Sequence, residues 1–209
     1  MYPLLTRRSF LALAASSASL GAVGHFSAPA NIPIGLPPQW ELLERALNDD
    51  RIGTIDYAHI SFAPDHPADL WAILAMLQAH EKWNRPQRVS VIADAAPPLN
   101  GPPIPFIGTI EINARTRITI DSRDSEPRTS AVNGSRGRLL IFNAKADYVS
   151  GQNAETFPVS WKTTHNYTPT RNAGEWAFKV CEALRESAKQ RGAVAFSDSN
   201  ALIPAPLRV

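Results

Sequence analysis

Residues whose side chains could exchange protons lie close together in one part of the chain. Asp65 and His66 are adjacent, and Asp94 ends the apolar, β-branched run 88–94. A carboxylate beside an imidazole can orient the ring and raise its basicity, which is what general base catalysis requires. Asp65 also stands where a helix is expected to begin, and Asp is a preferred N-cap residue. Capping alone would explain Asp65, and simple exposure would explain His66.

Histidines are also the candidate metal ligands, because imidazole is a common ligand in proteins. The four considered are His59, His66, His80 and His165. No H-E-x-x-H, C-x-x-C or close His pair accompanies them. We expect His80 at the surface near the end of a helix, and His59 in the core within a strand. The sequence therefore indicates no metal site, and it leaves the cofactor unknown.

Two segments are candidates for ligand binding. Arg115 and Arg117 belong to an arginine-rich stretch, and a guanidinium fork suits carboxylate or phosphate groups. His165 lies among hydroxyl and amide side chains in the segment 161–167. A solvated surface and ordinary turn composition would explain these segments equally well. Nucleic acid is not expected as a partner, because the local excess of positive charge is small and stacking aromatic residues are absent from the arginine-rich stretch.

The single cysteine offers no evident nucleophile. Cys181 falls on the apolar face of a helix beside Val180 and Leu184, where burial should raise the pKa of the thiol and make it unreactive. No G-x-S-x-G motif is present either. With one cysteine, no disulfide can form within the chain.

The elements that must position these residues follow from hydrophobic periodicity. Segment 54–62 is typical of a strand buried on both faces, a helix should begin at Pro67, and 88–94 should form a second strand. Such a βαβ unit is expected to be right-handed, with parallel strands. Ligands gather beyond the carboxyl ends of strands in such sheets, so Asp65, His66 and Asp94 should face one crevice.

The second half of the chain changes its period. Segment 95–106 holds five prolines and should form a long surface loop. Alternating isoleucine and polar residues over 110–121 predict strands with one wet face, and 121–137 should be a polar loop. The last helix should start at a capping box formed by Asn172 and Glu175. We therefore expect an α/β (or α+β) fold in a single domain, 31–209, in which the βαβ unit is followed by a partly antiparallel sheet and an amphipathic C-terminal helix.

The first thirty residues have the basic, apolar and small-residue zones of a secretory signal peptide, with Ala28 and Ala30 before the cleavage point. The run 6–11, T-R-R-S-F-L, resembles the twin-arginine (Tat) signal, with the arginine pair followed at the expected spacing by Phe and Leu. The residues that carry the resemblance are Arg7, Arg8, Phe10 and Leu11. Ala12 stands where a lysine is common in that family. The resemblance covers only the leader.

A removable leader sets the expected compartment. The apolar zone is shorter than the ~20 residues of a spanning helix and is diluted by serines, so no stable membrane anchor is expected after cleavage at Ala30. The resemblance implies the Tat translocase as a partner and a periplasmic or extracellular location. Loss of Arg7 and Arg8 from 21 basic and 19 acidic side chains balances the charge of the mature protein, which gives no general attraction to nucleic acid or anionic lipid.

No complete catalytic constellation is visible, so the sequence favours a binding or accessory factor of the periplasm. One alternative is a small hydrolase that uses Asp65, His66 and Asp94, with His165 or an arginine holding an anionic substrate. Another is an assembly partner of a membrane-associated complex that docks through the proline-rich loop. The sequence alone leaves all three hypotheses open.

Overall fold

The computed structural model of the chain describes residues 34–36, 39–62, 67–93, 105–123, 129–142, 145–158, 165–197 and 202–205. The expected leader, with Arg7, Arg8, Phe10, Leu11 and the cleavage point after Ala30, lies outside these residues. Asp65, His66, Asp94 and most of the proline-rich loop 95–106 also lie outside them.

The described helices are α2 (Gln39–Asn48), α3 (Pro67–Glu81) and α4 (Arg171–Gln190). The strands are β1 (Ile34–Leu36), β2 (Ile55–Ser61), β3 (Arg88–Ala93), β4 (Phe106–Glu111), β5 (Arg117–Asp121), β6 (Ser130–Gly134), β7 (Arg138–Ile141), β8 (Lys145–Ser150), β9 (Asn153–Pro158), β10 (His165–Tyr167), β11 (Val194–Phe196) and β12 (Leu202–Pro204). The prediction of an α/β fold with a mixed sheet is confirmed.

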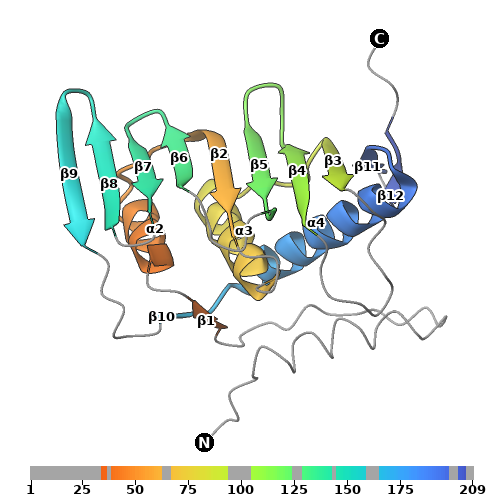
Figure 1. The fold of residues 1–209 in the computed structure, drawn as a ribbon, viewed down its shortest axis with the longest axis horizontal. Helices are drawn as coiled ribbons and strands as arrows, with labels where there is room; N and C mark the ends of the chain where they lie inside the picture. The colour runs from red at the N-terminus through yellow and green to blue at the C-terminus, as the bar shows by residue number, and fades with distance from the viewer. Residues whose placement is uncertain are drawn as a thin grey trace, which may run out of the picture.

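The main sheet has ten strands in the order β12-β11-β3-β4-β5-β2-β6-β7-β8-β9, and β1 pairs with β10 in a small separate sheet (Figure 1). Within the main sheet β2 and β5 are parallel, and the other described neighbours are antiparallel. The expected β2–α3–β3 unit therefore has strands that run in the same direction but are not adjacent. The antiparallel hairpin β4–β5 separates them.

Helix α3 lies between the other two helices along one face of the sheet (Figure 1). Its central residues are apolar on all sides, which suits this enclosed position. Residues 70–77 are all buried. Each large apolar side chain buried here stabilises the fold by about 1.5–3 kcal/mol. Among the described residues, no helix combines the length and the apolar character that crossing a membrane would require.

Helix α4 begins two residues before the position expected from sequence. Thr170 is its N-cap, and the Thr170 hydroxyl accepts a hydrogen bond from the amide of Ala173 at 3.4 Å. The expected capping box is therefore wrong. The Glu175 carboxylate is bound instead by Arg171, whose Nε donates to it at 2.9 Å.

The opposite face of the sheet carries polar side chains. On β5, Ile118 and Ile120 are fully buried, whereas Arg117 is exposed and Thr119 and Asp121 are half-buried. The predicted alternation over 110–121 is therefore confirmed. We call this surface, on which none of the described helices lies, the open face.

Strand β6 corrects the expectation of a continuous polar loop over 121–137. Val132 is almost fully buried and pairs with Ala58 of β2 on one side and Leu139 of β7 on the other. Gly134 ends the strand where a Cβ would stand 2.5 Å from the carbonyl oxygen of Ile52. The close approach of two backbone segments requires glycine at this position.

Candidate functional site

The segments that carry the predicted acid–base residues leave the sheet at one edge. Asp65 and His66 stand between the end of β2 at Ser61 and the start of α3 at Pro67, and Asp94 directly follows β3. Because β2, β3 and β5 run in the same direction, all three end at this edge (Figure 1). We call it the C-terminal edge. The expectation of one shared crevice concerns residues outside the described part of the chain and stays a prediction.

Hydrogen bonds between neighbouring strands hold the described part of the C-terminal edge. The amide of Ser61 donates to the Ser130 hydroxyl at 2.9 Å, and the amide of Phe62 donates to the carbonyl of Asp121 at 3.1 Å. The rings of Phe62 and Phe106 meet edge to face, with centroids 6.2 Å apart. These contacts make the strand ends a rigid framework from which loops can position functional side chains.

Asp121 is the described ionisable group at the end of β5. Arg123 donates to both of its carboxylate oxygens, from Nε at 3.1 Å and from Nη2 at 2.9 Å. These bonds, opposed in part by desolvation and aided by the nearby His59, lower the pKa of Asp121 below its ordinary value. The carboxylate is therefore held ionised by its arginine, which favours a structural or orienting role over proton exchange.

The predicted ligand-binding residues are placed at different ends of the molecule. Arg115 lies in the β4–β5 turn, where its amide donates to Asn113 Oδ1 at 2.8 Å, and Arg117 begins β5 with its guanidinium 3.8 Å from Glu111. Both arginines therefore lie at the edge opposite to the C-terminal edge. His165 begins β10, paired with Leu36 of β1, on the same side as the C-terminal edge (Figure 1).

His59 and His80 both differ from their expected environments, and both are half-buried. His80 donates from Nε2 to the carbonyl of Gly53 at 3.0 Å, and its side chain is only 17% exposed. His59 is half-buried on the open face. Within the described ranges, no three His, Cys, Asp or Glu side chains converge in a way that could hold a metal ion.

Cys181 has the environment that its sequence position predicted. Its side chain packs against the hydrophobic core, and burial raises the pKa of the thiol to about 12, with a smaller contribution from Glu182. The prediction that Cys181 packs on the apolar face of its helix is confirmed, and its lack of reactivity stays a prediction.

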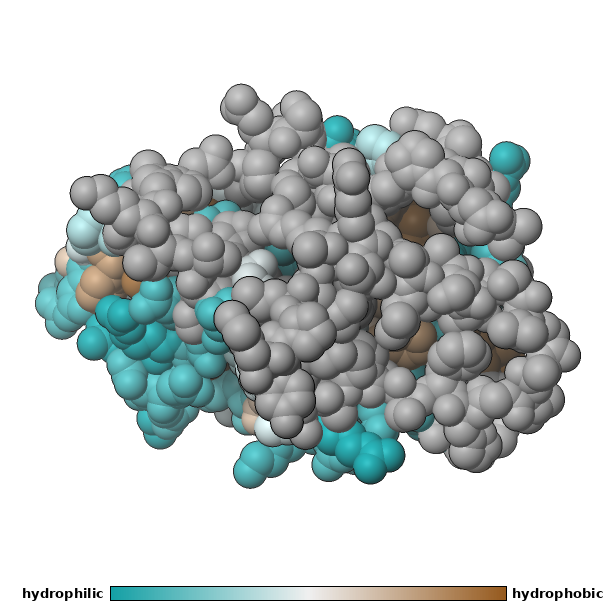
Figure 2. Space-filling view, turned by 90° about the horizontal axis from the view of Figure 1, so that it is seen from below, coloured by the Kyte–Doolittle hydropathy of each residue, from teal (hydrophilic) through white to brown (hydrophobic). Residues whose placement is uncertain are grey.

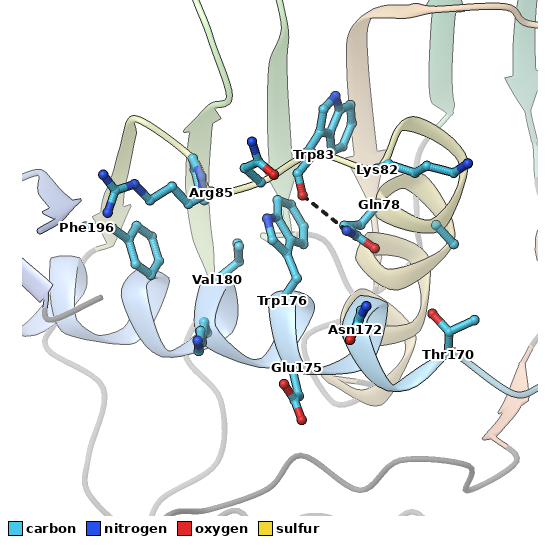
Figure 3. Close-up of a pocket in the computed structure, with 14 residues that line it drawn as sticks. Gln78, Lys82, Trp83, Arg85, Thr170, Asn172, Glu175, Trp176, Val180 and Phe196 are labelled. Carbon is cyan, nitrogen blue, oxygen red and sulfur yellow. Dashed lines mark hydrogen bonds between the residues drawn. The ribbon is translucent and has the colours of Figure 1, made fainter. Parts of the chain in front are cut away.

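Sequence reasoning missed a cavity of about 810 Å³ between the C-terminal end of α3 and the first half of α4 (Figure 3). Trp83 and Trp176 contribute to its lining. A tryptophan directly after a helix and another on an amphipathic helix were the available signals, but both patterns are equally typical of core packing.

Seen from the C-terminal edge, the described surface at the β8–β9 end of the molecule is mostly hydrophilic (Figure 2).

Comparisons with known proteins match the fold to solved oxidoreductases. No protein-family model matches the chain, and no curated protein matches it. An oxidoreductase from Agrobacterium radiobacter, solved with NAD+, L-tartaric acid and magnesium, has a TM-score of 0.52 at 11% identity over 78% of this chain and 65% of that chain. The aldose-aldose oxidoreductase of Caulobacter crescentus has 0.51 at 10% identity, over 78% and 64%. UDP-N-acetylglucosamine 3-dehydrogenase of Acidithiobacillus ferrooxidans has 0.51 at 14%, over 73% and 60%.

Two consequences follow from these comparisons. The chain spans less than two thirds of the length of each of these three proteins, and at such low identity the likeness shows the fold alone. The prediction of a binding or accessory factor is contradicted, because the similar solved structures are consistently named as oxidoreductases or dehydrogenases. The assembly-partner alternative is contradicted by the same finding, and nothing in the comparisons tests the hydrolase alternative.

Proposed function

We propose that this chain is part of an oxidoreductase that oxidises a hydroxyl group of a small polyhydroxylated compound, such as a sugar. The observation that carries the proposal is the fold shared with several solved oxidoreductases, two of which are named for an aldose or a nucleotide sugar. The C-terminal edge supports the proposal. Several strands end there and are joined by hydrogen bonds, and the segment that follows β2 carries the adjacent carboxylate and imidazole of Asp65 and His66.

One of the similar structures contains NAD+, which raises the question of whether the described residues of this chain could form a dinucleotide site. Dinucleotides bind at the start of a helix that follows a parallel strand and a glycine-rich turn. The described sheet has a single parallel pair, β2 and β5, and the sequence holds no G-x-G-x-x-G. The described residues therefore do not fit a dinucleotide, and the hydride acceptor must be held by other residues or by another polypeptide.

This chain would supply the proton-accepting side of the reaction. Oxidation of an alcohol to a carbonyl compound removes a proton from the hydroxyl oxygen together with a hydride from carbon. In our proposal the imidazole of His66 takes that proton, and Asp65 or Asp94 orients the ring. The segment that carries Asp65 and His66 connects the C-terminal edge, at Phe62, to the start of α3, at Pro67.

The proposal is tested by assaying the native protein, purified from its own cells so that any partner is retained. Sugars, alditols and sugar acids are offered with NAD+ or NADP+, and formation of reduced nicotinamide is followed by absorbance. We expect turnover with at least one polyhydroxylated substrate. No reduction with either dinucleotide across the whole set would contradict the proposal.

We also propose that the chain is exported by the Tat translocase and works in the periplasm or outside the cell. The support is the arginine pair, the short apolar zone and the small residues before Ala30. N-terminal sequencing of the protein from the periplasmic fraction should give a chain that begins at Asn31. Replacement of Arg7 and Arg8 by lysine keeps the charge and should hold the precursor in the cytoplasm. A wild-type cytosolic protein that still begins at Met1 would overturn this proposal.

A further inference from the structure

The cavity beside α4 lies away from the C-terminal edge. It is bounded by the end of α3, by the segment 82–86 that leads into β3, and by the N-terminal half of α4 (Figure 3). Segment 82–86 precedes the first residue of β3 and therefore lies at the edge opposite to the one where β3 ends. At about 810 Å³ the cavity falls within the range of sites that bind small molecules, about 300–1,000 Å³.

A specific chain reversal at the end of α3 builds the cavity. Lys82 adopts a left-handed conformation with φ 55°, and its amide donates to the carbonyl of Gln78 at 2.7 Å, which ends the helix. The side-chain amide of Gln78 then donates to the carbonyl of Trp83 at 3.1 Å (Figure 3). These two bonds fix the backbone of Trp83 over α4.

The tryptophans form an apolar wall of the cavity. The ring centroids of Trp83 and Trp176 are 5.9 Å apart, with 42° between the ring planes. Trp83 is 9% exposed and Trp176 is 7% exposed, so most of each ring is packed against other parts of the protein. Val180 and Phe196 extend the apolar lining on the side that the Trp176 ring nitrogen faces (Figure 3). Flat aromatic walls of this kind favour ligands with a flat apolar face.

The rim of the cavity is cationic. Lys82, Arg85 and Lys179 line it, and Arg85 also donates to the backbone carbonyl of Ser197. Glu175, the one carboxylate among the described residues of the lining, is paired with Arg171 at 2.9 Å and points away from the tryptophans (Figure 3). The electrostatic balance at the cavity therefore favours an anion.

A polar group within the wall points to a hydrogen-bond acceptor in the ligand. The indole nitrogen of Trp176 is buried, and it has no hydrogen-bond partner among the residues that the structure describes. A buried donor without an acceptor destabilises the folded protein. A ligand oxygen placed beside the ring would remove this penalty after a small shift of the side chain.

We propose that this cavity binds a small carboxylate with a flat apolar face, held between the tryptophan wall and the cationic rim. The site is separate from the C-terminal edge, and the inference does not rest on the proposed oxidoreductase function. An aromatic acid and a sugar acid share the required chemistry, since each has a carboxylate next to a flat ring or a flat C–H surface.

The test is a titration of the full-length protein with phenylacetate, D-glucuronate and uncharged 2-phenylethanol, followed by tryptophan fluorescence and calorimetry. At least one carboxylate should bind and should change the fluorescence, and the alcohol should bind about tenfold more weakly than phenylacetate. Binding of one carboxylate and not the other identifies which of the two ligand sources the site takes. Absence of binding by both acids at millimolar concentration would overturn the proposal.

Charge variants distinguish binding of the acid in this cavity from nonspecific electrostatic attraction of an anion to the protein. Lys82→Gln combined with Lys179→Gln removes two exposed cations from the rim and should raise the Kd of the bound acid about tenfold or more. Lys189→Gln is the matched control, because Lys189 is on the same helix but pairs with Glu186 outside the cavity lining. An equal change of Kd in both proteins would refute the proposed site. Thermal unfolding of each variant checks that the fold is retained.

Discussion

The indole nitrogen of Trp71 donates a hydrogen bond to the carbonyl oxygen of Gly174 at 3.1 Å. The same ring lies close enough that a Cβ on Gly174 would stand 3.1 Å from it. Helices α3 and α4 therefore meet at a glycine, and the contact joins the helix that follows the candidate site to the helix that lines the cavity. Since both sites depend on how these two helices pack, the contact is a natural place to perturb the fold.

Gly174→Ala should destabilise the protein by about 1 kcal/mol, because the added methyl group presses against the buried Trp71 ring, at a cost of about 1–3 kcal/mol that the better helix propensity of Ala, about 1 kcal/mol, offsets only in part. The free energy of unfolding is measured by urea denaturation. Gly192→Ala is the control, since a Cβ there would meet no atom closer than 3.8 Å. Equal stabilities of the Gly174 variant and the wild-type protein would show that the two helices are not packed as tightly as described.

Cys181 should resist modification in the folded protein. Burial raises the pKa of the thiol from 9.0 to about 12, so near neutral pH the reactive thiolate is about a thousandfold rarer than in an exposed cysteine. Alkylation by iodoacetamide, followed by mass spectrometry, should be at least about a hundredfold slower in the folded chain than in urea. Cys181→Ser provides the unlabelled control, and similar rates in both states would contradict the burial.

The Asp121–Arg123 pair should make part of the stability depend on pH. Arg123 lowers the pKa of Asp121 in the folded state below its ordinary value of 3.8. The stabilisation is therefore present above that value and is lost as the pH falls through the lower folded-state pKa. Asp121→Asn should cost stability at about pH 7 and much less at about pH 2, with a difference of at most about 1 kcal/mol because Arg123 is exposed. A cost that is equal at both pH values would contradict the ion pair.

The sequence predicted the elements that have a strong pattern of their own. Helix α3 and strand β5 are predicted by the spacing of their apolar residues, and those residues are buried in the structure. Strand β6 has no such pattern, because its short run of small and polar residues becomes a strand only through pairing with β2 and β7. The placement of β4 and β5 between β2 and β3 is a property of the whole sheet and leaves no local signal.

The candidate site was predictable only in part. The order of strand, acid–base pair and helix placed Asp65 and His66 at a strand end, and the direction of β2 and β3 agrees with a common edge. The cavity could not be predicted, because Trp83 reaches α4 through the left-handed turn at Lys82. Lysine rarely adopts this conformation, so the sequence does not indicate a turn there. His80 is less exposed than expected because it lies at the end of α3 that packs against the loop before β2. His59 is less buried than expected because it lies on the open face.

The central claim is that this chain supplies the proton acceptor for oxidation of a polyhydroxylated substrate at the C-terminal edge. The most direct test compares the rate of substrate-dependent nicotinamide reduction by the native protein with the rates of His66→Ala and His59→Ala. The account predicts that His66→Ala lowers kcat about 100-fold or more, while His59→Ala, which removes an imidazole from the open face, changes it less than about twofold. Unchanged turnover by His66→Ala, or no turnover by the wild-type protein, would contradict it.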